Sequence, residues 1–167
     1  TDKLQNFTVI ANSDINFKHS SFIEAAVVNA TIISKSGGIY FGNQAFQNCQ
    51  NLSRIIVKAP KKIQFAQYSF INSNVEFIDV SSYKEDAKLT LLDAAGSSNL
   101  IEISGNAFQN CQNLKEVALR SDDRITIEGN AFTKSTSLQT VTMDSKAVTV
   151  KGQAFKDCEL LKEITIP

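Results

Sequence analysis

The sequence contains one segment of eight residues twice, without a change. The segment A-F-Q-N-C-Q-N-L occupies residues 45–52 and returns at residues 107–114. Its phenylalanine belongs to a series with intervals of 24, 24, 38, 24 and 23 residues: Phe22, Phe46, Phe70, Phe108, Phe132 and Phe155. A fixed period of this length is typical of solenoids, in which each repeat buries its apolar side against its neighbours. We therefore expect one repeat domain over residues 1–167, with about six repeats and a buried ladder of phenylalanines.

Each repeat carries two short apolar patterns. In the first, two apolar residues flank a polar one, as in Ile15 and Phe17, which predicts a short strand with one buried face. The second is L-x-x-I-x-V, as in Leu52, Ile55 and Val57. When the repeats are stacked in register, the second strands form a parallel sheet on one side of the solenoid.

A segment with Ala, Phe and a Cys or Ser lies between the two patterns. In Ala107, Phe108 and Cys111 these residues occupy positions i, i+1 and i+4 behind a Gly-Asn turn, which fits one or two turns of helix. We therefore expect an α/β solenoid, with short helical turns and short strands opposite the parallel sheet. An insertion over residues 81–99 interrupts the period and is expected to leave the core as a loop at one edge.

Units such as G-N-A-F-x-x-C-x-x-L-K-E-V/I-x-I resemble the BspA-like leucine-rich repeat family, and the resemblance extends over the chain outside the insertion. The family lacks the L-x-L-x-x-N turn of the usual leucine-rich consensus, and so does this sequence. The resemblance implies a right-handed leucine-rich-repeat-like array. It also implies a surface-exposed or secreted protein of the adhesion type, of the kind found in host-associated bacteria and some protists, which binds host proteins or other cells.

The charges are balanced, with 17 basic and 17 acidic residues and no block of either sign. This balance disfavours nucleic acid and anionic membrane surfaces as partners. No apolar run approaches the roughly 20 residues of a membrane span, and residues 1–14 lack the pattern of a signal peptide. Both ends of the chain stop without a polar cap, which predicts either an excerpt from a longer array or self-association through the uncovered ends.

No motif for catalysis or for a cofactor is recognisable. The single histidine, His19, lies in a predicted turn, and the sequence has no nucleophile elbow, zinc-protease motif or phosphate-binding loop. The strongest acidic cluster, Asp122 and Asp123, is interpreted as a solvated turn because a metal site would need further oxygen ligands. We therefore predict no catalytic residue, no metal and no cofactor.

The three cysteines occupy one slot of the repeat. Cys49, Cys111 and Cys158 share this slot with Ala25, Ser73 and Ser135 in the other repeats. Slots two repeats apart are separated by roughly 10 Å, beyond the roughly 7 Å between Cα atoms that a disulfide allows. The cysteines are therefore expected to be small buried residues in a slot that selects for size, and they do not indicate the redox compartment.

The outward-facing residues of the long strands form the predicted binding surface. The early strands direct more apolar side chains outward than a solvated strand requires, and the later strands are polar and charged. The predicted binding residues combine this apolar patch with flanking charges and a charged rim: Ile10, Ile33, Arg54, Ile56, Lys58, Phe77, Asp79, Glu116 and Arg120. This composition is typical of a surface that binds a protein.

Three alternatives remain open. The outward apolar residues are also explained by strand propensity or by an insertion that folds over them. A parallel β-helix enzyme acting on polysaccharide is disfavoured because we expect no three acidic residues to share neighbouring strands. A mechanical spacer that holds another domain away from a surface cannot be separated from a binding module by sequence.

Overall fold

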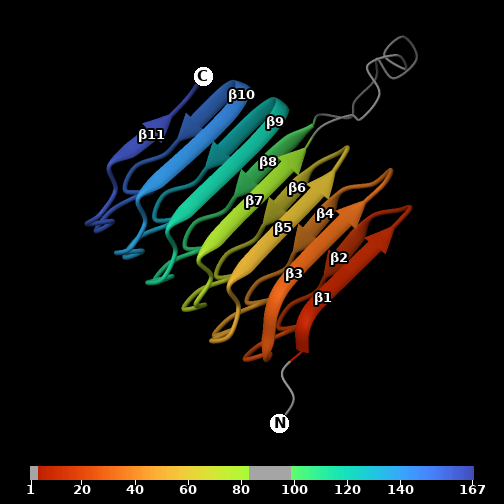
Figure 1. Cartoon of the computed structure of the whole chain (residues 1–167). Coiled ribbons are helices and arrows are strands. Elements are labelled where there is room, and N and C mark those ends of the chain that lie inside the picture. Colours follow the sequence, from red (N-terminus) through yellow and green to blue (C-terminus); the bar gives the residue numbers. More distant parts are fainter. Residues whose placement is uncertain (1–3, 83–98) are drawn as a thin grey trace.

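The computed structural model describes residues 4–82 and 99–167, which form a parallel β-solenoid of roughly six turns (Figure 1). The strands in chain order are β1 (Leu4–Ala11), β2 (Ile15–Phe17), β3 (Val27–Ser34), β4 (Ile39–Phe41), β5 (Arg54–Ala59), β6 (Ile63–Phe65), β7 (Phe77–Ser82), β8 (Leu100–Ile103), β9 (Glu116–Ile127), β10 (Thr140–Val150) and β11 (Glu163–Thr165). The described segments begin at β1 and finish at β11, at opposite ends of the stack.

The strands form two rows that run along the solenoid. The long-strand row consists of β1, β3, β5, β7, the first halves of β9 and β10, and β11. The short-strand row consists of β2, β4, β6, β8 and the second halves of β9 and β10. All pairs are parallel, and the apolar residues of successive repeats are in register, as in Val57, Val80 and Leu119. The predicted parallel sheet of stacked repeats is therefore confirmed.

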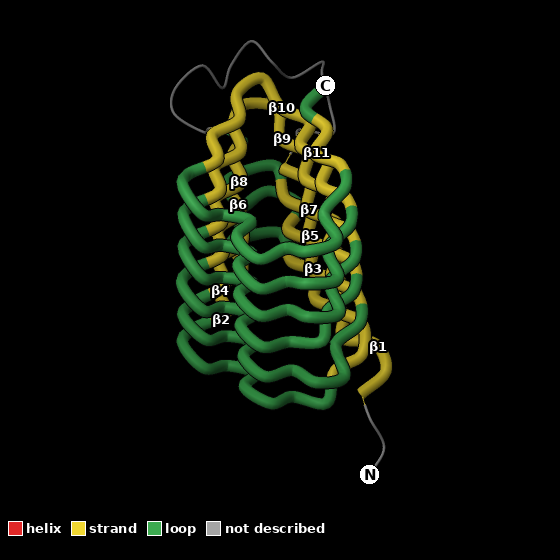
Figure 2. The backbone as a smooth tube through the Cα atoms, turned by 90° about the vertical axis from the view of Figure 1, so that its left-hand side faces the viewer, coloured by secondary structure: helices red, strands yellow, loops and turns green. Residues whose placement is uncertain are grey.

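The expected helical turns are wrong, because residues 4–82 and 99–167 contain no helix (Figure 2). Each Ala-Phe segment instead holds two residues with positive φ, four positions apart. In the fourth repeat these are Asn106 and Asn110, with φ of 59° and 60°. A residue in this left-handed region interrupts a right-handed helix, and asparagine tolerates it better than most residues. The segment therefore folds as successive tight turns.

The turns are joined to the next repeat by backbone hydrogen bonds. The N–H of Phe46 donates to the carbonyl of Ser69 at 2.7 Å, and the N–H of Asn48 donates to that of Ile71 at 3.0 Å. A helix would direct these groups along its own axis and leave the next repeat unbonded at this side. Side chains reinforce the connection, since Asn110 Nδ2 donates to Asn72 Oδ1 at 2.8 Å.

The core is a stack of phenylalanine rings, as predicted. Phe46, Phe70, Phe108 and Phe132 are fully buried, and consecutive rings are nearly parallel. The centroids of Phe46 and Phe70 lie 4.9 Å apart, which is close to the spacing of neighbouring strands.

Five of the six residues in the cysteine slot donate a side-chain hydrogen bond, and the exception is Ala25 in the first repeat. Cys111 Sγ donates to the carbonyl of Phe70 at 3.2 Å, and Ser73 Oγ donates to that of Phe46 at 2.6 Å. A thiol and a hydroxyl are therefore interchangeable at this slot because each bonds the carbonyl of the preceding repeat. The size criterion inferred from the sequence was incomplete.

The boundaries expected for the insertion were too wide. Ser81 and Ser82 belong to β7, and Ser82 Oγ donates to the carbonyl of Lys61 at 2.6 Å. Asn99 is buried against β9. Residues 83–98 lie outside the described residues, so the predicted loop stays a prediction.

The positive φ of Asn110 gives a testable prediction. Asn110→Val should lower the free energy of unfolding by about 1–3 kcal/mol, because a β-branched residue is strained in the left-handed region. Asn110→Gly keeps the conformation and loses only the side-chain bonds to Asn72 and to the exposed Gln112, so it should cost about 1 kcal/mol. Equilibrium urea denaturation measures both values. Gln109→Val, next to it and without a positive φ, is the control, and an equal loss there would contradict the assignment.

Candidate functional site

The outward residues of the long-strand row form one surface, here called the long-strand face. The long strands alternate buried and less buried residues, with the inward Ile55 and Val57 fully buried. This alternation confirms the predicted inward and outward assignment. Of the nine predicted binding residues, five are exposed and four are half-buried; the exposed ones are Ile10, Arg54, Asp79, Glu116 and Arg120, and the half-buried ones are Ile33, Ile56, Lys58 and Phe77.

The apolar residues of this face follow a diagonal across four neighbouring strands. Ile10 on β1 lies directly beside Ile33 on β3. Ile56 on β5 lies beside Thr31, which is two residues before Ile33 on β3. Phe77 on β7 lies beside Arg54, which is two residues before Ile56 on β5. Diagonal neighbours lie about 7–8 Å apart, within reach of long side chains. The face therefore holds a continuous apolar diagonal, defined here as Ile10, Ile33, Ile56 and Phe77.

Two cations lie at the ring of Phe77. The guanidinium carbon of Arg54 is 5.4 Å from the ring centroid, and Lys115 Nζ is 5.8 Å from it. Lys115 is also held by an ion pair with Glu76 at 2.5 Å. Each cation–π contact at such an exposed site contributes roughly 0.5–1 kcal/mol. The ring is thereby oriented at the end of the diagonal.

The charges of the face fall into paired and unpaired groups. Arg120 Nε and Asp144 Oδ2 form an ion pair at 3.3 Å, in the region predicted as the rim. Lys58 and Asp79 make no ion pair with any residue of the described ranges. Surface charges that pair with no other described residue can pair with charges of a second protein.

Two shallow hollows lie beside the diagonal. The larger, with a volume of about 340 Å³, is bordered by Lys58, Asp79, Arg120 and Asp144, and the smaller, of about 130 Å³, by Arg54, Phe77 and Glu116. Ala118 lines both. Its neighbours in register are Asp79 and Thr142, so the short side chain of alanine leaves a gap between longer ones.

Two residues near the diagonal, Lys115 at the Phe77 ring and Ala118 in the hollows, were missed by reasoning from the sequence. Lys115 was not assigned because it precedes the strand, and Ala118 because it carries no functional group. The signal for Ala118 was its short side chain, since the residues at the same position of the other long strands are Thr, Ile or Asp.

The repeat pattern is matched by the model of the BspA type leucine rich repeat region, in six copies over residues 1–90 and 82–167. The chain belongs to the BspA-type leucine-rich repeat family. No curated protein and no solved structure matches the chain. In the part of this BspA-type array that the structure describes, there is no helix long and apolar enough to span a membrane.

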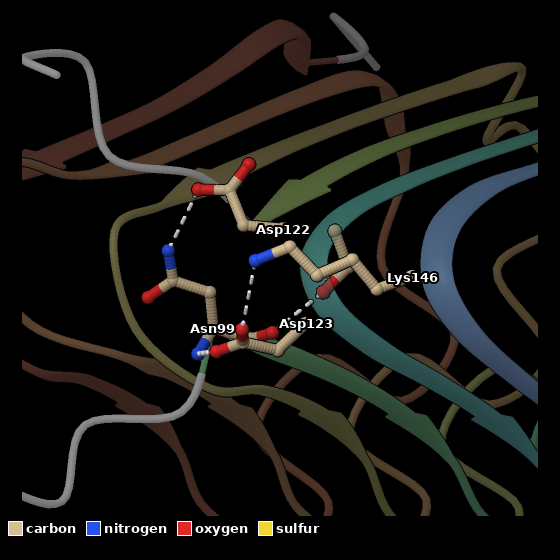
Figure 3. A network of polar contacts seen from close by, with 5 residues as sticks. Asn99, Asp122, Asp123 and Lys146 are labelled. Atoms are coloured by element: carbon tan, nitrogen blue, oxygen red, sulfur yellow. Dashed lines mark hydrogen bonds and ion pairs between the residues drawn. The ribbon is translucent and has the colours of Figure 1, made fainter.

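The acidic pair Asp122 and Asp123 of this BspA-type array lies inside β9, and the predicted turn is wrong. Asn99 Nδ2 donates to Asp122 Oδ2 at 2.9 Å, and the N–H of Asn99 donates to Asp123 Oδ2 at 3.0 Å (Figure 3). Lys146 Nζ lies 3.6 Å from Asp123 Oδ1. The pair therefore fixes Asn99 against β9 at the corner between the two rows. Within residues 4–82 and 99–167, no group of three acidic, histidine or cysteine residues is placed to hold a metal.

The cysteines of this BspA-type array are free thiols with raised pKa values. Burial raises the pKa of Cys111 to about 12 and those of Cys49 and Cys158 to about 11. A thiol is nucleophilic only as a thiolate, so these side chains are protonated and unreactive near neutral pH.

Cys158 allows a test of this protonation state. Because its pKa of about 11 exceeds the ordinary 9.0, its thiolate fraction at pH 8 should be about a hundredfold below that of an unhindered cysteine. The rate of alkylation by iodoacetamide in the Cys49→Ser, Cys111→Ser variant should rise with pH up to about 11. The urea-unfolded variant is the control and should level off near pH 9. A native rate that levels off below pH 9 would contradict the assignment.

Proposed function

We propose that this chain is a non-enzymatic protein-binding module that docks its partner on the long-strand face. The main support is the apolar diagonal, which leaves Ile10 57% exposed while four long strands remain regular beneath it. A set of outward apolar residues that continues across four strands is larger than the scattered exposed residues of an ordinary surface.

The chemistry around the diagonal suits protein recognition. Phe77 supplies a rigid aromatic anchor, and Arg54 adds a guanidinium that contacts the ring; both residue types are frequent in the energetically dominant parts of interfaces. Arg54 and Lys58 flank Ile56 on β5, and β1 and β3 add no outward charge. The first half of the face is therefore complementary to a partner surface that combines apolar and acidic groups.

The location and the partner class are proposals that rest on the family. The BspA-like repeats that this chain resembles are found largely in surface-exposed or secreted adhesion proteins, so we propose a cell-surface or secreted location. The partner is then a host extracellular protein or a protein on another cell. The chain has a formal net charge of zero, which agrees with recognition through a local surface patch rather than through long-range attraction by an excess of one charge.

A polysaccharide-active enzyme is not favoured by the geometry, although one expectation about its acids was wrong. The register places Asp79, Glu116 and Asp144 on three successive strands, β7, β9 and β10. Asp79 and Asp144 are two strands apart and also offset along the strands, so their Cα atoms are more than about 9 Å apart. Asp144 is engaged by Arg120, which leaves Asp79 and Glu116 as a diagonal pair on neighbouring strands. The carboxyl pair of a glycosidase flanks the scissile bond of its substrate, and the two hollows beside these acids are shallow.

Two substitutions test the proposal against a panel of purified extracellular-matrix proteins measured by surface plasmon resonance. Ile56→Asp and Phe77→Asp should each weaken binding at least about a hundredfold, as expected for residues that dominate an interface. Each should lower the free energy of unfolding by about 1–3 kcal/mol, because both side chains are half-buried and Phe77 also loses its two cation–π contacts.

Thr149→Asp provides the matched control, since it adds the same charge on the short-strand row. It should bind like the unsubstituted chain. Binding that is equally weakened by Thr149→Asp, or unaffected by both face variants, would exclude the long-strand face. A chain that binds no member of the panel would favour the spacer.

A further inference from the structure

A second surface of the chain, on the short-strand row, carries a small polar site. Its residues lie on the neighbouring strands β2, β4 and β6 and in the turns just before them (Figure 1). They form two columns, each made of residues at the same position in successive repeats. One column holds Asn16, Tyr40 and Gln64, and Asp14, Gly38 and Lys62 lie two residues earlier on the same three repeats. Together they line a hollow of about 160 Å³.

Gly38 forms the floor of this hollow. A Cβ at this position would lie 2.5 Å from the carbonyl oxygen of Lys62, so no other residue fits without a shift of the backbone. The glycine therefore allows the backbone of Lys62 to approach closely. Gly38 lines the hollow together with Asp14 and Lys62 of the neighbouring repeats.

The groups around the floor are held in place. Asp14 Oδ1 accepts a hydrogen bond from the N–H of Gly38 at 2.7 Å, which leaves Oδ2 as an acceptor. Lys62 Nζ pairs with Glu102 at 2.5 Å and keeps further N–H donors. Because each charge already has a partner, the site favours a neutral ligand with both donors and acceptors over an ion.

Tyr40 supplies the wall of the hollow. Its side chain is 37% exposed, and its neighbours in register are the amides of Asn16 and Gln64, one strand spacing of about 4.8 Å to either side. Neither amide makes a hydrogen bond within the described part of the chain. The site therefore combines a partly exposed aromatic ring with two amides that each donate and accept.

We propose that this hollow binds one ring of a carbohydrate. A pyranose ring has a face of C–H groups that packs on an aromatic ring, and hydroxyls at its edge that donate and accept. Asn16, Gln64, Asp14 and Lys62 surround Tyr40 with complementary groups. A volume of about 160 Å³ is below the roughly 300–1,000 Å³ of sites that enclose a drug-sized ligand, so a single ring is bound, either free or as one unit of a longer glycan.

The test uses the ¹⁵N-labelled chain and backbone amide chemical shifts. Methyl β-D-glucopyranoside, methyl α-D-mannopyranoside and N-acetyl-D-glucosamine are titrated separately, with glycerol as a polyol that has no ring. At least one saccharide should give saturable shifts at Gly38, Tyr40 and Gln64, and glycerol should give none. An absence of saturable shifts with all three saccharides, or equal shifts with glycerol, would overturn the proposal.

Substitutions identify the ring and the amides as the binding groups. Tyr40→Ala should weaken binding about tenfold, Gln64→Ala by about threefold to tenfold, and Tyr40→Phe by much less. Tyr68→Asn is the matched control, because Tyr68 is equally exposed at 38% and lies outside the hollow. A loss as large with Tyr68→Asn as with Tyr40→Ala would overturn the assignment. Phe77→Asp should leave saccharide binding unchanged, so this site and the long-strand face are tested independently.

Discussion

The backbone hydrogen bonds between successive Ala-Phe turns are the interaction on which the rest of the structure depends. They keep the turns of successive repeats at the same spacing as the strands on the opposite side of the solenoid. The phenylalanine rings attached to these turns then stack with centroids 4.9 Å to 5.3 Å apart from Phe22 through Phe155. The left-handed residues make this possible, because they direct alternate N–H groups along the solenoid axis toward the next repeat.

The same constraint explains which parts of the fold could be predicted. The period of 24 residues and the alternation within the strands are sufficient for the parallel rows, the register and the buried ring stack. The turn segment could not be assigned from apolar spacing, since Ala107, Phe108 and Cys111 fit one helical turn as well as they fit the observed turns. In the fourth repeat the better signal was the pair Asn106 and Asn110, because asparagine favours positive φ at both ends of the segment. The other repeats carry at most one asparagine at these two positions, so the signal is weaker there.

The candidate sites were less predictable than the fold. The two-residue period of a strand decides which side chains point inward and which point outward. The outward positions of Ile56 and Phe77 could therefore be assigned correctly. The hollows lie at a short residue, Ala118, or at a close backbone contact that only glycine allows, Gly38, beside longer neighbours from other repeats. Such gaps arise from the register between repeats and not from any motif within one of them. They can be identified only when it is known which residues of different repeats lie side by side.

The duplicated segment separates the structural requirement from the functional one. After A-F-Q-N-C-Q-N-L at residues 45–52 the outward residues are Arg54, Ile56 and Lys58, and after the copy at residues 107–114 they are Glu116, Ala118 and Arg120. Both copies occupy the same buried environment, where loss of one phenylalanine would cost about 3–5 kcal/mol. The outward positions bear no such cost, since surface substitutions typically change stability by about 0.5 kcal/mol or less. Identical turns followed by different outward triplets therefore agree with a scaffold whose face varies independently of its core, which is the property that a binding module requires.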